Sequence, residues 1–232
     1  MQLPKRTWGG GEGRAVLLVH GLSSDSGSWW RVGPHLAERG WRVTAVDLRG
    51  HGEAPRGDGY AITDYAGDLP VGPWDGVVGH SLGAAVAIVA AERIRAGRLV
   101  LLDPVLRVDP GSDVREGQLA ELGLTRERLR AEKPHWRDED VVAKLRGIAA
   151  TEFEVVDRTF TDNDPWDVVD ALAALTMPVT VLRGDPAVYT MVADDELDAA
   201  GKPVRIIPGA GHSPHRDRPE ATLDAIVEAL EG

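Results

Sequence analysis

The sequence predicts an α/β domain in which a mostly parallel central sheet is flanked by helices. Short apolar runs alternate with helical patterns along most of the chain, which is typical of parallel strands joined by crossover helices. The helical patterns begin at proline or end at glycine, as natural helices do. The length of 232 residues, with 43% of them apolar, suits one domain with a substantial core.

The alternation defines the elements in order. The expected strands are the apolar runs at residues 15–20, 42–47, 75–79, 99–103, 179–184 and 204–208. The expected helices that accompany them span residues 28–39, 82–96 and 219–231. Gly40 and Gly97 end the first two helices, and Pro219 begins the third, where a helix tolerates proline.

The alternation stops after Pro104. Residues 105–174 contain helical patterns but no convincing strand, so we expect a helical cap inserted between two parts of the core, residues 1–104 and 175–232. These patterns lie at residues 119–122, 126–132, 138–146, 152–158 and 165–175. The alternative is that they are ordinary crossover helices that cover the sheet.

Composition narrows the class of partner. The net charge of −11 disfavours nucleic acid and anionic membranes, because both are bound through clustered Lys and Arg. The absence of cysteine excludes disulfides, a thiolate nucleophile and Cys-ligated zinc. The first residues lack the apolar stretch of a secretion signal, and no apolar run approaches the roughly twenty residues that cross a bilayer. We expect a soluble, cytoplasmic protein with a small-molecule substrate; its oligomeric state is left open.

Residues 77–85, with the sequence VVGHSLGAA, carry the pattern G-x-S-x-G between an expected strand and an expected helix. Gly79 and Gly83 allow a sharp turn that presents the Ser81 hydroxyl at the carboxyl end of the strand. Open α/β sheets bind their ligands at that edge. The pattern therefore predicts a nucleophilic serine, with a structural serine in a tight turn as the alternative.

A serine nucleophile needs a general base to take up its proton. His212 is the best candidate, because it lies in a glycine-bearing loop between the last expected strand and the last helix. This loop leaves the sheet at the same edge as Ser81. His215 is the weaker alternative, since it lies further into the segment that enters the helix.

The base in turn needs a carboxylate that orients it. We expect this group to be Asp185, which directly follows the strand at residues 179–184. Asp103 ends the strand at residues 99–103 and competes by the same argument. Asp194 and Asp195, further along the chain, are weaker alternatives.

The oxyanion formed during attack needs hydrogen-bond donors already in place. A strand that ends in His20 and Gly21 is followed by a loop, where the backbone N–H of Leu22 is a candidate donor. The N–H of Leu82, directly after Ser81, is the second, and it gains from the dipole of the helix that begins there.

These features together resemble the α/β-hydrolase fold superfamily, in its cap-bearing, cofactor-independent branch of serine hydrolases and esterases. The resemblance implies Ser81 as nucleophile, Asp185 as acid, His212 as base, and Leu22 and Leu82 as oxyanion donors. It also implies two antiparallel strands before the first parallel one, and the short start of this chain leaves room for one. The motifs are HGL at 20–22, DLRGHG at 47–52, GHSLG at 79–83 and GH at 211–212.

Aromatic and polar residues near these motifs are candidates for the substrate pocket or for structural roles. His20 and the loop that begins at Asp47 are expected to be held by internal hydrogen bonds. For each tryptophan in the pocket set, packing in the core is the alternative. The candidate pocket residues are Ser23, Trp29, Trp30, Trp136 and Trp166.

The sequence thus favours a serine hydrolase that cleaves an ester, lactone or related acyl bond of a small to medium apolar substrate through an acyl-enzyme. We expect no cofactor and no metal. Relatives with the same pattern also catalyse C–C bond hydrolysis, cofactor-free peroxidation or lyase reactions, so these remain alternatives. A ligand-binding, receptor-like protein with little turnover is the alternative from another class.

Overall fold

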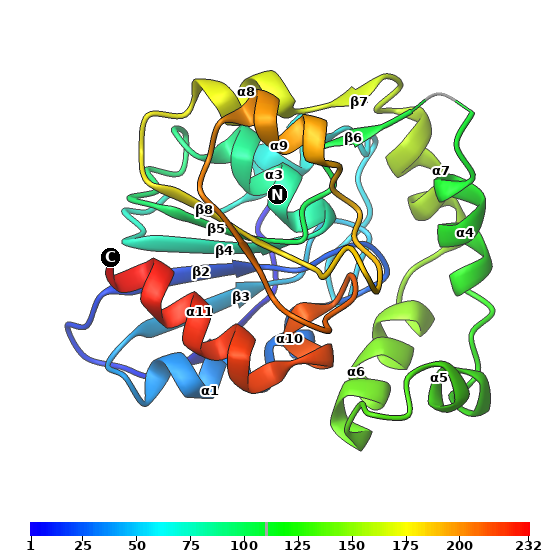
Figure 1. Cartoon of the computed structure of the whole chain (residues 1–232), viewed down its shortest axis with the longest axis horizontal. Coiled ribbons are helices and arrows are strands. Elements are labelled where there is room, and N and C mark those ends of the chain that lie inside the picture. Colours follow the sequence, from blue (N-terminus) through cyan, green and yellow to red (C-terminus); the bar gives the residue numbers. More distant parts are fainter. Residues whose placement is uncertain (110) are drawn as a thin grey trace.

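The structure is a computed structural model that describes residues 1–109 and 111–232. A seven-stranded sheet runs through the molecule in the order β1–β3–β2–β4–β5–β8–β9, and β1 is its antiparallel strand (Figure 1). Each expected strand is present with its ends within two residues, so the predicted fold class is confirmed. The strands are β1 (Lys5–Trp8), β2 (Ala15–Val19), β3 (Arg42–Val46), β4 (Gly76–His80), β5 (Leu99–Leu102), β8 (Val179–Arg183) and β9 (Val204–Ile206).

Strand β1 is absent from the sequence-based prediction. Its residues, KRTW, are polar and largely exposed, so they carry no apolar run. The strand forms because it pairs with β3 at the edge of the sheet, with Lys5 opposite Val46. A single antiparallel strand precedes β2 in residues 1–14.

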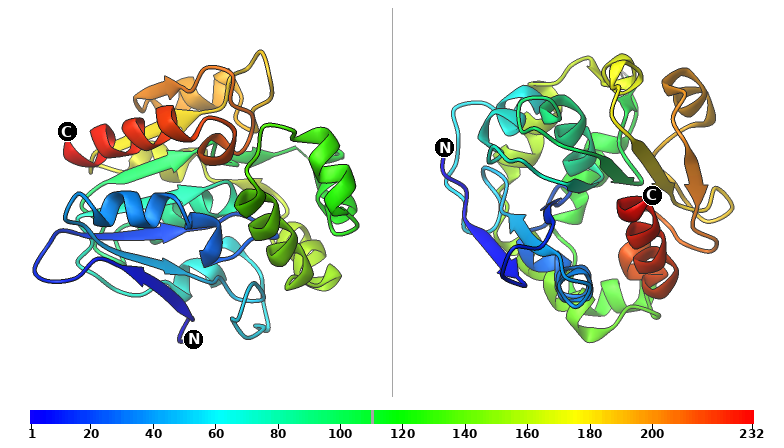
Figure 2. Two further views of the ribbon diagram at one scale, coloured as in Figure 1. Left: turned by 90° about the horizontal axis from the view of Figure 1, so that it is seen from below. Right: turned by 90° about the vertical axis from the view of Figure 1, so that its left-hand side faces the viewer.

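Helices cover both faces of the sheet. One face carries α1 (Val32–Ala37) and α11 (Pro219–Glu231), which lie in front of the strands when the molecule is seen from below (Figure 2, left). Leu36 and Ile226 belong there to the same buried apolar cluster as Val16 and Leu18 of β2. The other face carries α2 (Ile62–Asp68), α3 (Leu82–Ala90), α8 (Val169–Ala174) and α9 (Asp194–Ala200).

Two expected helices are shorter than predicted. The pattern at residues 28–39 forms a 3₁₀ helix, η1 (Ser26–Trp29), followed by α1. Asp25 begins the 3₁₀ helix, since its side chain accepts a hydrogen bond from the Gly27 N–H at 2.7 Å. Helix α3 ends at Ala90 rather than at residue 96.

The region after Pro104 divides into two parts. Helices α4 (Val114–Glu121), α5 (Arg126–Glu132), α6 (Asp138–Ala149) and α7 (Phe153–Thr161) lie beyond the carboxyl ends of the strands (right side of Figure 1). Helix α8 instead packs against α3 and α9 over the sheet. For this helix the structure thus agrees with the alternative, a crossover helix that covers the sheet. The division into core and cap at residues 105 and 174 stays a prediction.

A short two-stranded ribbon joins the α4–α7 segment to the rest of the chain. Its strands, β6 (Arg107–Val108) and β7 (Trp166–Asp167), pair antiparallel in a region where no strand is expected. Two residues per strand are too few to produce a periodic pattern. Of the helices in the described residues, none has the length and apolar content to cross a membrane.

Candidate active site

Ser81 lies in a sharp turn between β4 and α3. Its backbone angles, φ 55° and ψ −122°, belong to a region that L-residues rarely adopt. The turn depends on Gly83, where a Cβ atom would lie 2.3 Å from the carbonyl oxygens of Val19 and His20. Glycine at this position therefore lets α3 approach β2 closely, and the turn presents the Ser81 hydroxyl at the edge of the sheet.

A chain of hydrogen bonds runs from Ser81 through His212 to Asp103. The Ser81 Oγ atom lies 2.9 Å from His212 Nε2, and His212 Nδ1 lies 2.6 Å from Asp103 Oδ2. His212 sits in the loop after β9, and Asp103 directly follows β5 and is fully buried. The predicted pairing of Ser81 with His212 is therefore present, and His215 takes no part in it.

The predicted contact between Asp185 and His212 is wrong. The Asp185 carboxylate instead accepts hydrogen bonds from the N–H groups of Gly209 at 2.8 Å and Ala187 at 2.9 Å. It joins the loops that follow β8 and β9. Asp103, the first alternative, occupies the expected place, because β5 lies next to β4 whereas β8 lies one strand further from Ser81.

The weaker acidic alternatives also lie away from His212. Asp194 and Asp195 belong to the first turn of α9. Asp194 forms an ion pair with Arg183, and Asp195 lies 3.9 Å from Arg107. Both carboxylates therefore lie at the start of α9 and face arginines of neighbouring segments.

Donors surround the Asp103 carboxylate. One oxygen accepts from the Gly184 N–H at 2.9 Å and the Thr190 hydroxyl at 2.5 Å, and the other accepts from the Met191 N–H at 2.9 Å. Burial by itself raises the pKa of Asp103, but the hydrogen bonds and charge of His212 and these further donors outweigh it. The pKa is lowered as a result, so Asp103 is ionised and favours a proton on His212 Nδ1.

Two backbone N–H groups beside Ser81 are free to act as donors. Within the described residues, neither Leu22 N–H nor Leu82 N–H donates to a protein acceptor. Both residues border the same small cavity as Ser81. Leu82 is also the first residue of α3, where the helix dipole favours negative charge. This arrangement suits an oxyanion next to Ser81.

The histidines around the site hold its loops. His20 Nδ1 lies 2.7 Å from the Gly21 carbonyl oxygen, and His20 Nε2 accepts from the Leu48 N–H at 3.0 Å, so the predicted anchoring role is confirmed. His80 Nε2 lies 2.7 Å from the carbonyl oxygen of His212 and braces that loop. Burial lowers the pKa of both His20 and His80, so both are neutral at pH 7.

Two cavities meet at Ser81 and His212. The larger, of about 190 Å³, extends between the sheet edge and the α4–α7 segment and includes Trp136 in its wall. The smaller, of about 20 Å³, is bordered by Phe160 and Trp166. Trp136 and Trp166 thus line the site as expected for pocket residues.

The other three candidate pocket residues do not line either cavity. Trp29 is buried in the core, with its ring 5.1 Å from that of His215. Trp30 donates from Nε1 to Asp140 of α6 at 3.0 Å. Ser23 is fully buried in the loop before η1. The contacts that the structure shows for these residues are with other parts of the protein.

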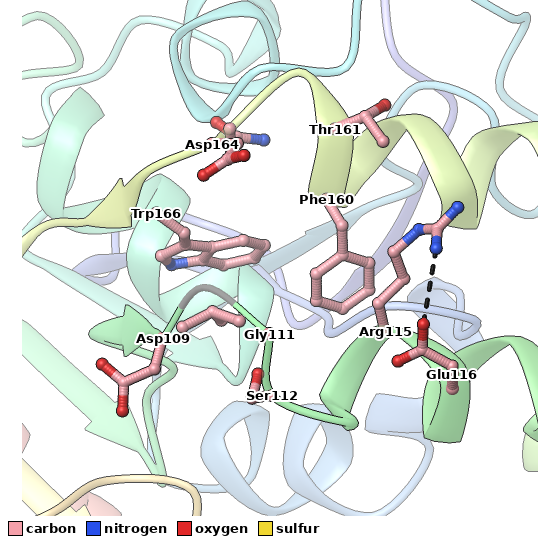
Figure 3. A pocket seen from close by; sticks show the side chains of 11 residues that line it. Asp109, Gly111, Ser112, Arg115, Glu116, Phe160, Thr161, Asp164 and Trp166 are labelled. Carbon is pink, nitrogen blue, oxygen red and sulfur yellow. Dashed lines mark ion pairs between the residues drawn. The ribbon is translucent and has the colours of Figure 1, made fainter.

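A separate cavity of about 390 Å³ lies on the outer side of Phe160 and Trp166. Figure 3 shows these two rings side by side in its wall, and their centroids are 5.7 Å apart. Ser81 does not border this cavity. Among the described residues, no group of three or more His, Cys, Asp or Glu side chains is arranged to hold a metal ion.

The sequence reasoning missed Thr190, Met191 and Arg216. The first two hold the Asp103 carboxylate, and Arg216 borders the 190 Å³ cavity. Their only signal in the sequence is that they follow the expected strands at residues 179–184 and 204–208. Arg216 also lies four residues after His212, in the short helix that begins at Pro214.

The chain is similar to hydrolases along nearly its whole length. The model of the alpha/beta hydrolase family matches residues 16–225. A 2-(acetamidomethylene)succinate hydrolase from Mesorhizobium japonicum is 27% identical over 257 aligned positions, which cover 95% of this chain and 89% of that protein. An N-formylmaleamate deformylase from Pseudomonas putida is 28% identical over 192 positions, covering 75% of this chain and 71% of the relative.

Solved structures agree with the sequence relatives. An N-formylmaleamic acid deformylase from Pseudomonas putida superposes with a TM-score of 0.76 at 25% identity, covering 96% of this chain and 94% of that one. A thermophilic esterase from Thermogutta terrifontis superposes with a TM-score of 0.74 at 27% identity, covering 99% and 93%.

Proposed function

This protein belongs to the alpha/beta hydrolase family and is a hydrolase, and from that premise we propose that it cleaves a carboxylic ester or related acyl bond through a serine acyl-enzyme. The observation that carries the proposal is the continuous hydrogen-bonded chain from Ser81 through His212 to Asp103. A hydroxyl is a weak nucleophile unless a base takes its proton, and this chain supplies the base and its orienting group.

The proposed reaction assigns one role to each group. Ser81 Oγ attacks the substrate carbonyl while His212 Nε2 accepts the hydroxyl proton. The ionised Asp103 keeps the other ring proton on Nδ1 and stabilises the imidazolium that forms. His212 then gives its proton to the leaving group, and a water molecule, activated by the same base, hydrolyses the acyl-enzyme.

The free N–H groups of Leu22 and Leu82 support this assignment. The tetrahedral intermediate carries a negative oxygen, and donors already in place stabilise it without reorganisation. Because Leu82 begins α3, the end of the helix adds favourable electrostatics at the same point.

The cavities indicate a small substrate. Their volumes of about 190 and 20 Å³ are below the usual range of drug-sized pockets. Two relatives are named for an acetamidomethylene and an N-formyl compound, so an N-acyl amide belongs in the substrate panel beside aryl esters and lactones.

Replacement of Ser81 by alanine tests the proposal. We expect Ser81→Ala to lower kcat on the best substrate of the panel by a factor on the order of 10³ or more. A serine-reactive fluorophosphonate should label the wild-type protein with one equivalent and leave Ser81→Ala unlabelled. Ser112→Ala is the matched control, because Ser112 lies outside both cavities at Ser81, and it should retain both properties.

Full activity of Ser81→Ala, or folded wild-type protein that resists labelling, contradicts the acyl-enzyme route. Turnover confined to a diketone in the same panel supports the alternative of C–C bond hydrolysis with the same three residues.

A further inference from the structure

Arg216 is a buried cation in the wall of the catalytic cavity. It belongs to the short helix α10 (Pro214–Asp217), four residues after His212, and only 5% of its surface is exposed. Together with Ser81 it borders the cavity of about 190 Å³. Within the described residues, its guanidinium forms no hydrogen bond and no ion pair, and its Nε atom is buried without a partner. Arginine presents five N–H donors, so this is an unusual state for a buried side chain.

The carboxylates whose charge acts on Arg216 are already bound to other groups. Glu121 pairs with Lys144 at 2.6 Å, and Asp140 pairs with Arg31 at 3.1 Å. Asp217 accepts from Trp136 Nε1 at 2.7 Å. Burial lowers the pKa of Arg216, yet an arginine in a protein stays protonated. The cation therefore lacks a direct counter-ion in the protein.

A second cation lies near the first. The Trp136 ring has Arg216 Cζ at 5.1 Å and Lys133 Nζ at 5.8 Å from its centroid. Lys133 also borders the cavity and forms no ion pair within the described residues. The cavity wall does carry Glu121 and Glu132, but Glu132 pairs with Arg128 at 2.8 Å, away from Arg216. This end of the cavity is therefore favourable for a negative charge.

The other side of Ser81 has no such charge. The cavity of about 20 Å³ is bordered by Leu82, Val105, Phe160 and Trp166, and none of its lining residues is Lys, Arg, Asp or Glu. A substrate carboxylate bound there would lose its hydration without gaining a cationic side chain as a partner. The site is thus polar and cationic on one side and apolar on the other.

We propose that the substrate of this hydrolase carries a carboxylate, and that Arg216 binds it in the cavity opposite the apolar side of Ser81. The planar guanidinium matches a carboxylate in a two-point contact, which a neutral group of the same shape does not reproduce. The inference rests on the proposed serine hydrolase and specifies its substrate class. It replaces the apolar substrate expected from the sequence with one that has an anionic end.

A pair of substrates of equal shape tests the inference on the wild-type protein. The p-nitrophenyl monoester of glutarate carries a free carboxylate, and the corresponding primary amide is neutral. We expect kcat/KM to favour the carboxylate by about tenfold or more, as a charge-assisted contact with arginine predicts. Equal kcat/KM for the two esters, or a preference for the amide, overturns the inference without any variant.

Variants then connect the preference to Arg216. Arg216→Met should remove most of the preference, so that the ratio of kcat/KM for the carboxylate ester to kcat/KM for the neutral amide falls toward one. Arg216→Lys should keep part of the preference, because the charge remains but the two-point contact is lost. Arg218→Met is the control of equal charge change, since Arg218 is exposed, two residues away, and outside the cavity. A preference that persists in Arg216→Met overturns the role of Arg216.

Direct binding separates this inference from the proposed chemistry. Glutarate should bind to the wild-type protein in calorimetry, and Arg216→Met should weaken that binding about tenfold or more. If fluorophosphonate labelling fails but glutarate binds through Arg216, the acyl-enzyme is wrong and the anion site stands. If labelling succeeds and glutarate binds equally to Arg216→Met, the anion site is wrong and the acyl-enzyme stands.

Discussion

Asp103 and Asp185 both lie at the carboxyl edge of the sheet, but the Asp103 carboxylate accepts more hydrogen bonds than that of Asp185. Asp103 is fully buried, has a positive φ of 37°, and accepts hydrogen bonds from three further groups in addition to its contact with His212. Asp185 binds only the N–H groups of its own and a neighbouring loop. Under the proposed mechanism, loss of the charge of Asp103 should therefore lower kcat far more than loss of the charge of Asp185.

We predict that Asp103→Asn lowers kcat by a factor on the order of 10³ to 10⁴, because an amide no longer holds His212 in the required tautomer. Asp185→Asn, the matched control, should change kcat by less than about threefold, since it does not contact His212. Steady-state kinetics on one aryl ester measures both. The opposite ranking of the two variants would return the acidic role to Asp185.

Among the elements, the junction of β4 and α3 has little tolerance for added atoms. Helix α3 is apolar on all sides, LGAAVAIVA, because α2 covers one side and the sheet the other. Its second residue, Gly83, touches the backbone of β2, and the contacting atoms are carbonyl oxygens that cannot rotate away.

We predict that Gly83→Ala lowers the free energy of unfolding by about 1 to 3 kcal/mol, through overpacking against fixed backbone atoms. Gly67 of α2 is the matched control, because a Cβ atom there meets nothing within 4 Å. Gly67→Ala should raise stability by about 0.5 to 1 kcal/mol, the usual gain in a helix. Urea unfolding followed by circular dichroism distinguishes the two. A Gly83→Ala protein as stable as the wild type would contradict the close packing.

The strands that sequence patterns missed are those whose formation depends on a partner strand. Strand β1 is polar and forms at the edge of the sheet, while β6 and β7 contain two residues each and pair only with one another. Most of the strands that were predicted are buried apolar runs, such as AVLLV in β2, and burial by itself explains their composition, whereas β9 is exposed.

Across the whole molecule, four buried histidines share one property. Burial lowers the pKa of His20, His51, His80 and His215, and the pKa of His51 falls to about 3. In His20 a hydrogen bond adds to the effect of burial. Its Nε2 accepts from the Leu48 N–H, so a proton on Nε2 would face that N–H and break the hydrogen bond. The native protein therefore holds these rings neutral over a wide range of pH.

We predict that the free energy of unfolding falls as the pH decreases below about 6.5. The unfolded chain binds protons at these histidines below their ordinary pKa, and the native state does not, so acid favours unfolding. Each ring contributes up to about 1.4 kcal/mol per pH unit until its lowered native pKa is reached. Urea unfolding between pH 8 and 5.5 measures the slope.

His51→Gln tests whether buried histidines cause this pH dependence, because it removes the histidine whose pKa burial lowers to about 3. The variant should show a shallower loss of stability with acid by up to about 1.4 kcal/mol per pH unit. Stability that stays constant from pH 8 to 5.5 would contradict neutral, buried histidines.

Sequence patterns were enough to predict the parallel strands, the sharp turn at Ser81, His212 as the partner of the Ser81 hydroxyl and the two N–H groups next to them. These features follow from local patterns, since apolar runs, glycines and strand ends have structural consequences within a few residues. The choice of Asp103 over Asp185 as the partner of His212 depends on the three-dimensional fold, because both residues follow a strand and their distance from Ser81 is set by the strand order. The three-dimensional fold also decided that Arg216 borders the cavity without a counter-ion, because pairing among charged side chains depends on which distant loops and helices meet.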